Sequence, residues 1–154
     1  MSRACGENHR SSQPTGKPQH VIIAGFGLSG RACANVLLAK GISICVIEKN
    51  QVTVDRCQAG GLEIIGGDAS DPEVLKQAGI ERATEVAVTI PDDATTLQIV
   101  EQARALNKTA HVVARCTFVS GGMEACRRGA NQVVVAEQVV AGEFGRVMRE
   151  IGGK

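Results

Sequence analysis

The chain has 154 residues, a formal net charge of +1 at pH 7 and 44% hydrophobic residues. This length suits one domain that can bury a core, and the balanced charge argues against nucleic acid or a charged membrane surface as a partner. The longest apolar runs are far shorter than the roughly 20 residues that span a bilayer. With three Phe and neither Trp nor Tyr, the chain excludes tyrosine chemistry and offers few platforms for stacked bases.

The N-terminal segment and the cysteines set two further expectations. Residues 1–19 are polar and lack the apolar segment of a secretory signal, so we predict a flexible polar leader. None of the six cysteines lies in a Cys-x-x-Cys pair or in a Cys/His cluster with zinc spacing, so no metal site is expected. We interpret them as small reduced residues of a cytoplasmic protein, with a disulfide or a redox role as the alternative.

Apolar runs alternate with segments of helical periodicity along the rest of the chain. Strands are predicted over 20–25, 43–48, 62–68, 85–90, 110–116 and 132–136. Helices are predicted over 29–40, 51–59, 119–128 and 137–151. A further helix is predicted to start at Ser70-Asp71-Pro72-Glu73, with Ser70 as its cap, and another to run from a cap at Asp92 or Asp93 to about Leu106. Such alternation is typical of a parallel sheet covered by helices on both faces. We therefore expect an α/β, doubly wound, Rossmann-like fold with strand order 3-2-1-4-5-6.

Three glycines follow the first strand at a characteristic spacing. In the stretch HVIIAGFGLSG, Gly25 would let the chain turn off the strand, Gly27 would let the backbone approach a pyrophosphate, and Gly30 would let helix and strand pack closely. The N–H groups at the start of the following helix favour phosphate. The loop from Gly25 to Gly30, with Phe26, Leu28 and Ser29 between the glycines, is therefore the candidate phosphate-binding segment.

Glu48 ends the second strand at the place where a carboxylate accepts hydrogen bonds from ribose hydroxyls. It would also repel a 2′-phosphate, so NADP is disfavoured, although the adjacent Lys49 softens that argument. Together with the glycines, this residue favours a dinucleotide or adenine nucleotide over a purely structural glycine turn.

Further candidates follow the later strands. Asp68, with the backbone of Ala69, could meet the adenine amino edge, or Asp68 could make a turn with its own backbone. Thr89 and Asp92 follow the fourth strand and face the same crevice by topology. Arg115, at the end of the fifth strand, could balance phosphate charge or form a surface or interface ion pair.

The chain resembles the RCK N-terminal domain, also called TrkA-N or KTN, a regulator of potassium conductance. The resemblance covers roughly residues 20–151 and depends on VIIAGFGLSG, Glu48, GGDAS, VTIPDD, VVARC and GANQVVVAEQVVAGEF. It implies a nucleotide-sensing regulatory domain of a potassium or other monovalent cation channel, uptake system or antiporter. By position it assigns phosphate contacts to Gly25, Gly27 and Gly30, the ribose to Glu48, and adenine to Asp68 and Ala69.

The same resemblance sets expectations for ligands, partners and domains. Such domains bind NAD(H), ATP, ADP or AMP, form homodimers or larger rings, and act on a membrane partner or a fused membrane domain from the cytoplasmic side. Residues 20–136 would be the nucleotide-binding domain, and 137–154 the crossover helix that packs on a neighbouring subunit. The alternative is that this helix, with its stripe of Val140, Phe144, Val147 and Ile151, folds back onto its own sheet.

A small NAD-dependent oxidoreductase is the alternative function. Such an enzyme needs a proton donor or acceptor near the nicotinamide. The chain has no Tyr, and its three histidines lie in the leader, at the start of the first strand and near the start of the fifth strand, away from the crevice. We therefore expect a protein that is not an enzyme and has no catalytic residues.

Overall fold

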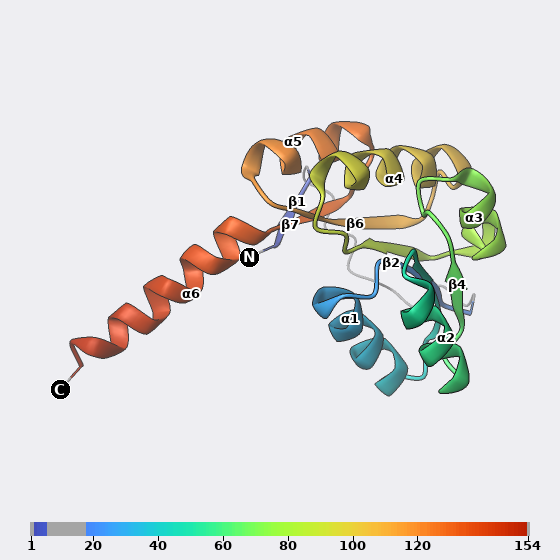
Figure 1. Ribbon diagram of the computed structural model, residues 1–154. Coiled ribbons are helices and arrows are strands. Elements are labelled where there is room, and N and C mark those ends of the chain that lie inside the picture. Colours follow the sequence, from blue (N-terminus) through green and yellow to red (C-terminus); the bar gives the residue numbers. More distant parts are fainter. Residues whose placement is uncertain (1, 6–17, 154) are drawn as a thin grey trace.

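The computed structural model describes residues 2–5 and 18–153 (Figure 1). The strands are β1 (Ser2–Ala4), β2 (His20–Ala24), β3 (Ser43–Glu48), β4 (Ile64–Gly66), β5 (Glu85–Val88), β6 (His111–Cys116) and β7 (Gln132–Val135). The helices are α1 (Leu28–Ala39), α2 (Gln51–Ala59), α3 (Pro72–Gln77), the 3₁₀ turn η1 (Ile80–Arg82), α4 (Asp93–Leu106), α5 (Val119–Arg128) and α6 (Ala136–Ile151). None of the described helices is long and apolar enough to cross a bilayer.

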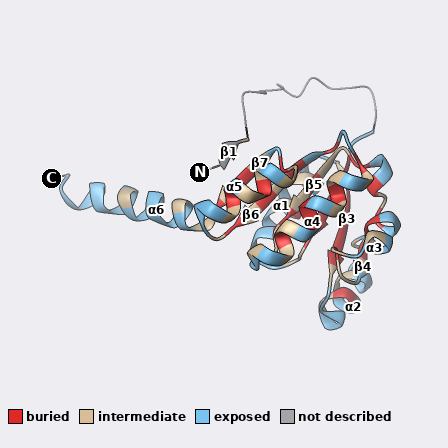
Figure 2. Cartoon of the chain, turned by 90° about the horizontal axis from the view of Figure 1, so that it is seen from above, coloured by how far each residue is buried: buried red, intermediate tan, exposed pale blue. Residues whose placement is uncertain are grey.

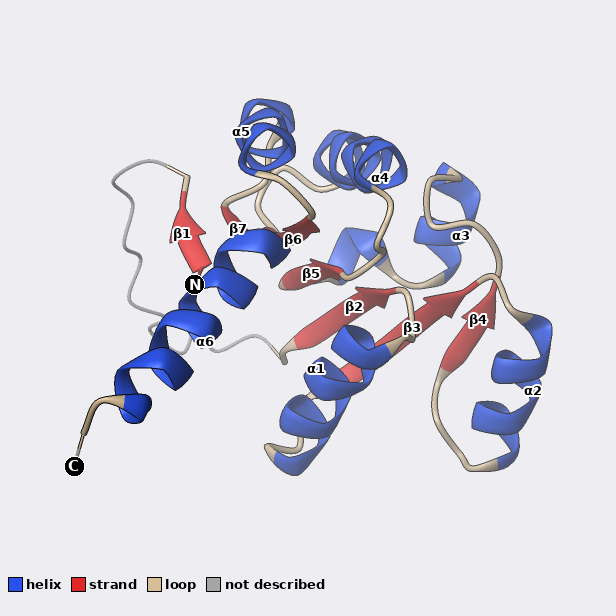
Figure 3. Cartoon of the chain, turned by 60° about the vertical axis from the view of Figure 1, so that its left-hand side comes forward, coloured by secondary structure: helices blue, strands red, loops and turns tan. Residues whose placement is uncertain are grey.

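The seven strands form one sheet in the order β1-β7-β6-β5-β2-β3-β4 (Figure 3). Strands β2 to β7 are parallel to one another, and without the antiparallel β1 they have the predicted order 3-2-1-4-5-6. The order reverses beside β2, so the loops after β2 and β5 diverge to opposite faces of the sheet. In sheets of this kind, ligands bind in the crevice at that switch point.

Helices cover both faces of the sheet and enclose two apolar clusters. Helices α3, α4 and α5 lie over one face, where Ile22, Val86, Ile99 and Val100 belong to the larger cluster (Figure 1). Helices α1 and α2 lie over the other face, and that cluster includes Val21, Ile23, Val46 and Val54. Because β2 is buried on both faces, its residues from Val21 to Ala24 form an uninterrupted apolar run after the polar His20.

Side-chain caps fix several helix starts next to the strand ends. The Asp92 carboxylate accepts a hydrogen bond from Thr95 N at 2.8 Å and caps α4. Of the two residues predicted as this cap, Asp92 and Asp93, the structure thus selects Asp92. Asp71, and not the predicted Ser70, caps α3, with Pro72 in its first turn. Aspartate and serine are both good caps, so two adjacent candidates cannot be separated by residue type alone.

The N-terminal segment differs from its prediction. Residues Ser2–Ala4 pair antiparallel with β7, so the flexible leader predicted over 1–19 is wrong for these three residues, and residues 6–17 lie outside the described part of the chain. Cys5 forms a disulfide with Cys126 of α5, which corrects the expectation that all six cysteines are reduced. The other four cysteines are free.

The C-terminal helix α6 does not fold back onto its own sheet. It starts directly after β7, has no buried residue and projects away from the rest of the chain (Figures 1 and 2). Its apolar side chains are therefore exposed, among them Phe144 at 66% and Ile151 at 74%. Within one chain, the alternative of a helix packed on its own sheet is wrong.

Candidate functional site

The glycine loop between β2 and α1 is held by backbone contacts that only glycine permits. Gly25 has φ +95°, a left-handed conformation that L side chains rarely adopt, and its N–H donates to Ile47 O at 2.9 Å. A Cβ at Gly30 would overlap the carbonyl oxygen of Gly25. The Thr89 hydroxyl lies 3.0 Å from Ala24 O and 3.1 Å from Gly25 O, either of which it can donate to. Thr89 thus fixes the turn from the neighbouring strand, a role that its position after β5 did not predict.

Gly27 has a different environment. Its φ of −78° is available to any residue, and a Cβ there would meet no atom of the described chain within 4 Å. No side chain among the described residues caps α1, and its first turn carries no acidic residue. The N–H groups of this turn and the space above Gly27 therefore remain available to an anionic group. Leu28 beside them is 90% exposed, and the Arg31 guanidinium lies 5.5 Å from the Phe26 ring.

Glu48 joins the glycine loop to the end of β3. Its Oε2 accepts from Phe26 N at 2.9 Å, and its Oε1 accepts from Asn50 N at 2.9 Å. Each carboxylate oxygen keeps a second acceptor position, so the pair of backbone contacts leaves capacity for ribose hydroxyls. Asn50 also caps α2 through Thr53 N, and this supporting role was not predicted.

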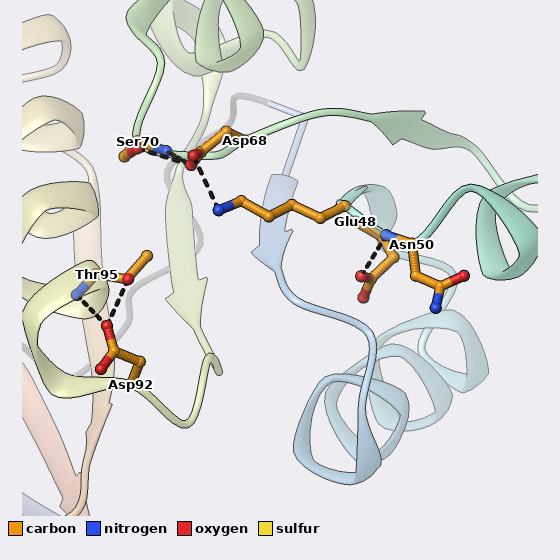
Figure 4. Close-up of polar contacts among 7 residues, drawn as sticks. Glu48, Asn50, Asp68, Ser70, Asp92 and Thr95 are labelled. Atoms are coloured by element: carbon orange, nitrogen blue, oxygen red, sulfur yellow. Dashed lines mark hydrogen bonds and ion pairs between the residues drawn. The ribbon is translucent and has the colours of Figure 1, made fainter.

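Asp68 and Lys49 form an ion pair beside the ends of β3 and β4. Figure 4 shows Asp68 with its contacts to Ser70. Asp68 Oδ1 accepts from Ser70 N at 2.9 Å and from Ser70 Oγ at 2.7 Å, whereas Oδ2 lies 2.9 Å from Lys49 Nζ. The hydrogen bonds from Ser70, aided by Lys49, lower the pKa of Asp68 to about 2. The carboxylate is therefore ionised at neutral pH. The turn with its own backbone, one of the two alternatives for Asp68, is present in the structure.

The remaining candidates are less closely connected. Asp92 caps α4, its pKa is lowered mainly by hydrogen bonds from Thr95, and Lys49 contributes a smaller electrostatic effect (Figure 4). Ala69 is buried at 3% exposure, so little of the residue, side chain or backbone, is open to a ligand in this structure. Arg115 lies on the sheet face away from α4 and α5, makes no hydrogen bond or ion pair with the other candidates, and its buried Nη1 has no hydrogen-bond partner among the described residues.

These elements define a class: a doubly wound, Rossmann-like domain with a glycine turn at its switch point. The TrkA-N domain model matches residues 21–136, and the chain belongs to this family. The resemblance drawn from the sequence motifs is thereby confirmed.

The relatives include domains of membrane transport proteins. The putative cation/proton antiporter YbaL of Escherichia coli K12 is 33% identical over 122 residues, which are 79% of this chain and 22% of YbaL. The crystal structure of the YbaL TrkA-N domain aligns with 32% identity and a TM-score of 0.78, covering 86% of this chain and 96% of that domain. GsuK bound to ADP aligns with 28% identity and a TM-score of 0.77, covering 88% of this chain and 35% of that one. This chain thus spans about a fifth of the length of YbaL.

Proposed function

We propose that this chain is a nucleotide-sensing regulatory domain of a cation transport system. It binds NAD(H) or an adenine nucleotide, ATP, ADP or AMP, in the crevice beside the glycine loop. The observation that carries this proposal is the open space at Gly27, next to uncapped N–H groups of α1 and to the Glu48 carboxylate. A phosphate at α1 and a ribose at Glu48 would use these groups together.

The family relatives support a role in regulation. YbaL is described as a cation/proton antiporter, and GsuK as a channel whose structure contains ADP. By analogy, this domain acts on a membrane cation channel or transporter, as a separate subunit or as a fused domain, from the cytoplasmic side. Nucleotide binding shifts the partner only if the nucleotide binds two states of the assembly with different affinities.

The described histidines are poorly placed for dehydrogenase chemistry. His20 is buried, and its ring nitrogens lie 2.8 Å from Ala78 O and 3.2 Å from Ser43 Oγ. His111 is exposed at the start of β6, at the opposite end of the strand from the crevice. Neither is positioned to exchange a proton with a substrate beside a nicotinamide, which favours a sensor over an oxidoreductase.

Isothermal titration calorimetry with NADH, NAD, ATP, ADP and AMP tests the proposal. Gly27→Val should abolish or weaken binding at least about tenfold, or about 1.4 kcal/mol, because its side chain fills the phosphate space. Gly152→Val is the control, since Gly152 is also a helix cap residue with open space around it, but lies far from the crevice at the end of α6. Both variants should unfold like wild type. Wild-type protein that binds none of the five nucleotides, or Gly27→Val protein that binds as well as wild type, would refute the proposed site.

We further propose that α6 packs on a second copy of this chain in a homodimer or a larger homo-oligomer. Val140, Phe144, Val147 and Ile151 share one face, and none of them is buried within the chain. Burying a side chain as large as Phe contributes about 1.5–3 kcal/mol, so an unpaired face of this size favours association.

Light scattering after size exclusion measures that association directly. Phe144→Asp should shift the mass toward the monomer, whereas Val52→Asp should not, although Val52 on α2 is equally exposed at 66%. An unchanged mass for Phe144→Asp would exclude α6 as the dimer contact.

A further inference from the structure

The N-terminal strand β1 lies at the outer edge of the sheet, where it pairs with β7. Ser2 is opposite Val134, Arg3 is opposite Val133, and Ala4 is opposite Gln132. Cys5 follows at once, and its N–H donates to Asn131 O at 2.9 Å. The strand therefore covers the edge of β7 immediately before the chain enters α6 (Figures 1 and 3).

A covalent bond holds this short strand in place. Cys5 is bonded to Cys126 in the last turns of α5, 121 residues away in the sequence. Helix α5 itself packs on β7 through Gly122, where a Cβ would lie 3.2 Å from Val135 and 3.3 Å from Val133. A three-residue strand makes few hydrogen bonds, so the disulfide and the strand pairing depend on one another to hold the N-terminus on the sheet.

Three of the four free thiols are unsuited to the same chemistry. Burial is the main cause that raises the pKa of Cys45 and of Cys116 to about 11, so both stay protonated at neutral pH. Burial also raises the pKa of Cys33 on α1. Thiolates are the reactive form in disulfide exchange, so the buried thiols exchange slowly. Only one pair of the six cysteines is brought together in the described structure.

Disulfides in reducing compartments are usually transient and redox-sensing. We propose that Cys5 and Cys126 form a redox-controlled latch, which clamps β1 on the edge of β7 when oxidised and releases it when reduced. The latch depends on the proposed function only for the reducing, cytoplasmic surroundings in which this disulfide would be reversible. The latch itself requires no nucleotide and no second copy of the chain.

The oxidant in this step is a small-molecule disulfide. One cysteine thiolate attacks it, which forms a mixed disulfide and releases one small thiol. The second cysteine thiolate then attacks the protein sulfur of the mixed disulfide, which forms the Cys5–Cys126 bond and releases the second small thiol. The two protein thiols lose two protons and two electrons, and the small-molecule disulfide gains them.

Thiol counting on the purified full chain tests the chemistry. After equilibration in oxidised or reduced glutathione, acid quenching and alkylation under denaturing conditions, mass spectrometry should find four alkylated cysteines in the oxidised protein and six in the reduced protein. Cys33→Ser, the control, should lower both counts by one and keep the difference. Cys5→Ser and Cys126→Ser should each remove the difference. Six alkylated cysteines in wild-type protein at every oxidant concentration would overturn the proposal.

Hydrogen exchange tests the movement of the strand. Amides of residues 132–134, which lie opposite β1, should exchange faster in the reduced protein and in Cys5→Ser than in the oxidised protein, whereas amides of β2 should not change. Equal protection of β7 in the two redox states would show that the disulfide does not hold the strand, and this would overturn the latch even if the bond forms. Neither measurement involves nucleotide, so either can fail while the sensing proposal stands.

Discussion

Glu48 is expected to stabilise the nucleotide-free protein against unfolding, in addition to binding ribose. The Glu48→Ala variant loses the contact to Phe26 N, which is partly buried, and the contact to Asn50 N, which is exposed, both at 2.9 Å. A hydrogen bond to a charged group contributes about 1.5–3 kcal/mol when shielded from water and less when exposed. We therefore expect Glu48→Ala to lower the free energy of unfolding by about 2–3 kcal/mol, or the melting temperature by about 5–10 °C.

Urea and thermal unfolding without nucleotide measure this effect, and calorimetry then measures nucleotide affinity on the folded variant. Glu101→Ala is the control, because Glu101 makes one exposed ion pair with Arg128, and such a pair contributes about 0–1 kcal/mol. If Glu48→Ala unfolds like wild type without nucleotide, the carboxylate does not anchor the glycine loop, and the reasoning from its two backbone contacts is wrong.

Three further predictions concern the glycine turn, a buried amide and the turn at Asp68. Gly30→Ala should unfold at a much lower temperature than wild type, because its Cβ overlaps Gly25 O, and near-wild-type melting would contradict the tight turn. Asn107→Ala should cost about 2–4 kcal/mol in urea unfolding, because it leaves buried partners of the amide, including Ile80 O and Ala110 N, without hydrogen bonds; the exposed Asn35→Ala is its control. Ser70→Ala should raise the pKa of Asp68 from about 2 toward its unfolded value of about 4. The variant should therefore be less stable than wild type by a full amount above about pH 4, and this difference should vanish as the pH falls to about 2. If the urea midpoints of wild type and Ser70→Ala differ by the same amount at every pH in this range, the pKa of Asp68 is not the cause.

The order of the parallel strands could be predicted because each signal is local. The apolar run ending at Ala24, the glycine turn and the Asp92 cap each lie within a few residues, and the handedness of the crossovers then limits the topology. The position of Glu48 at the carboxyl end of β3 was likewise predicted from the strand pattern that follows the glycine turn. What the sequence predicted well is what short-range chemistry determines.

The missed features depend on contacts between distant parts of the chain. Strand β1 has three residues and no apolar alternation, so nothing local indicates that it pairs with β7. The partner of Cys5 lies 121 residues away, and six cysteines alone allow many pairings. Asn107, whose amide contacts the carbonyl oxygens of Ile80 and Ala83, looks like an ordinary loop residue in the sequence.

The direct junction between β7 and α6 has a mechanical consequence. Val135 is both the last residue of the strand and the cap residue of the helix, and Glu137 N donates to Thr117 O at 3.2 Å, so no loop separates sheet and helix. The 16 residues of α6 rise about 1.5 Å each, which makes a rigid arm of about 24 Å. A tilt of the last strand by about 5° would move the far end of such an arm by about 2 Å. A change too small to disturb packing inside the sheet thus becomes a displacement of atomic size at Ile151.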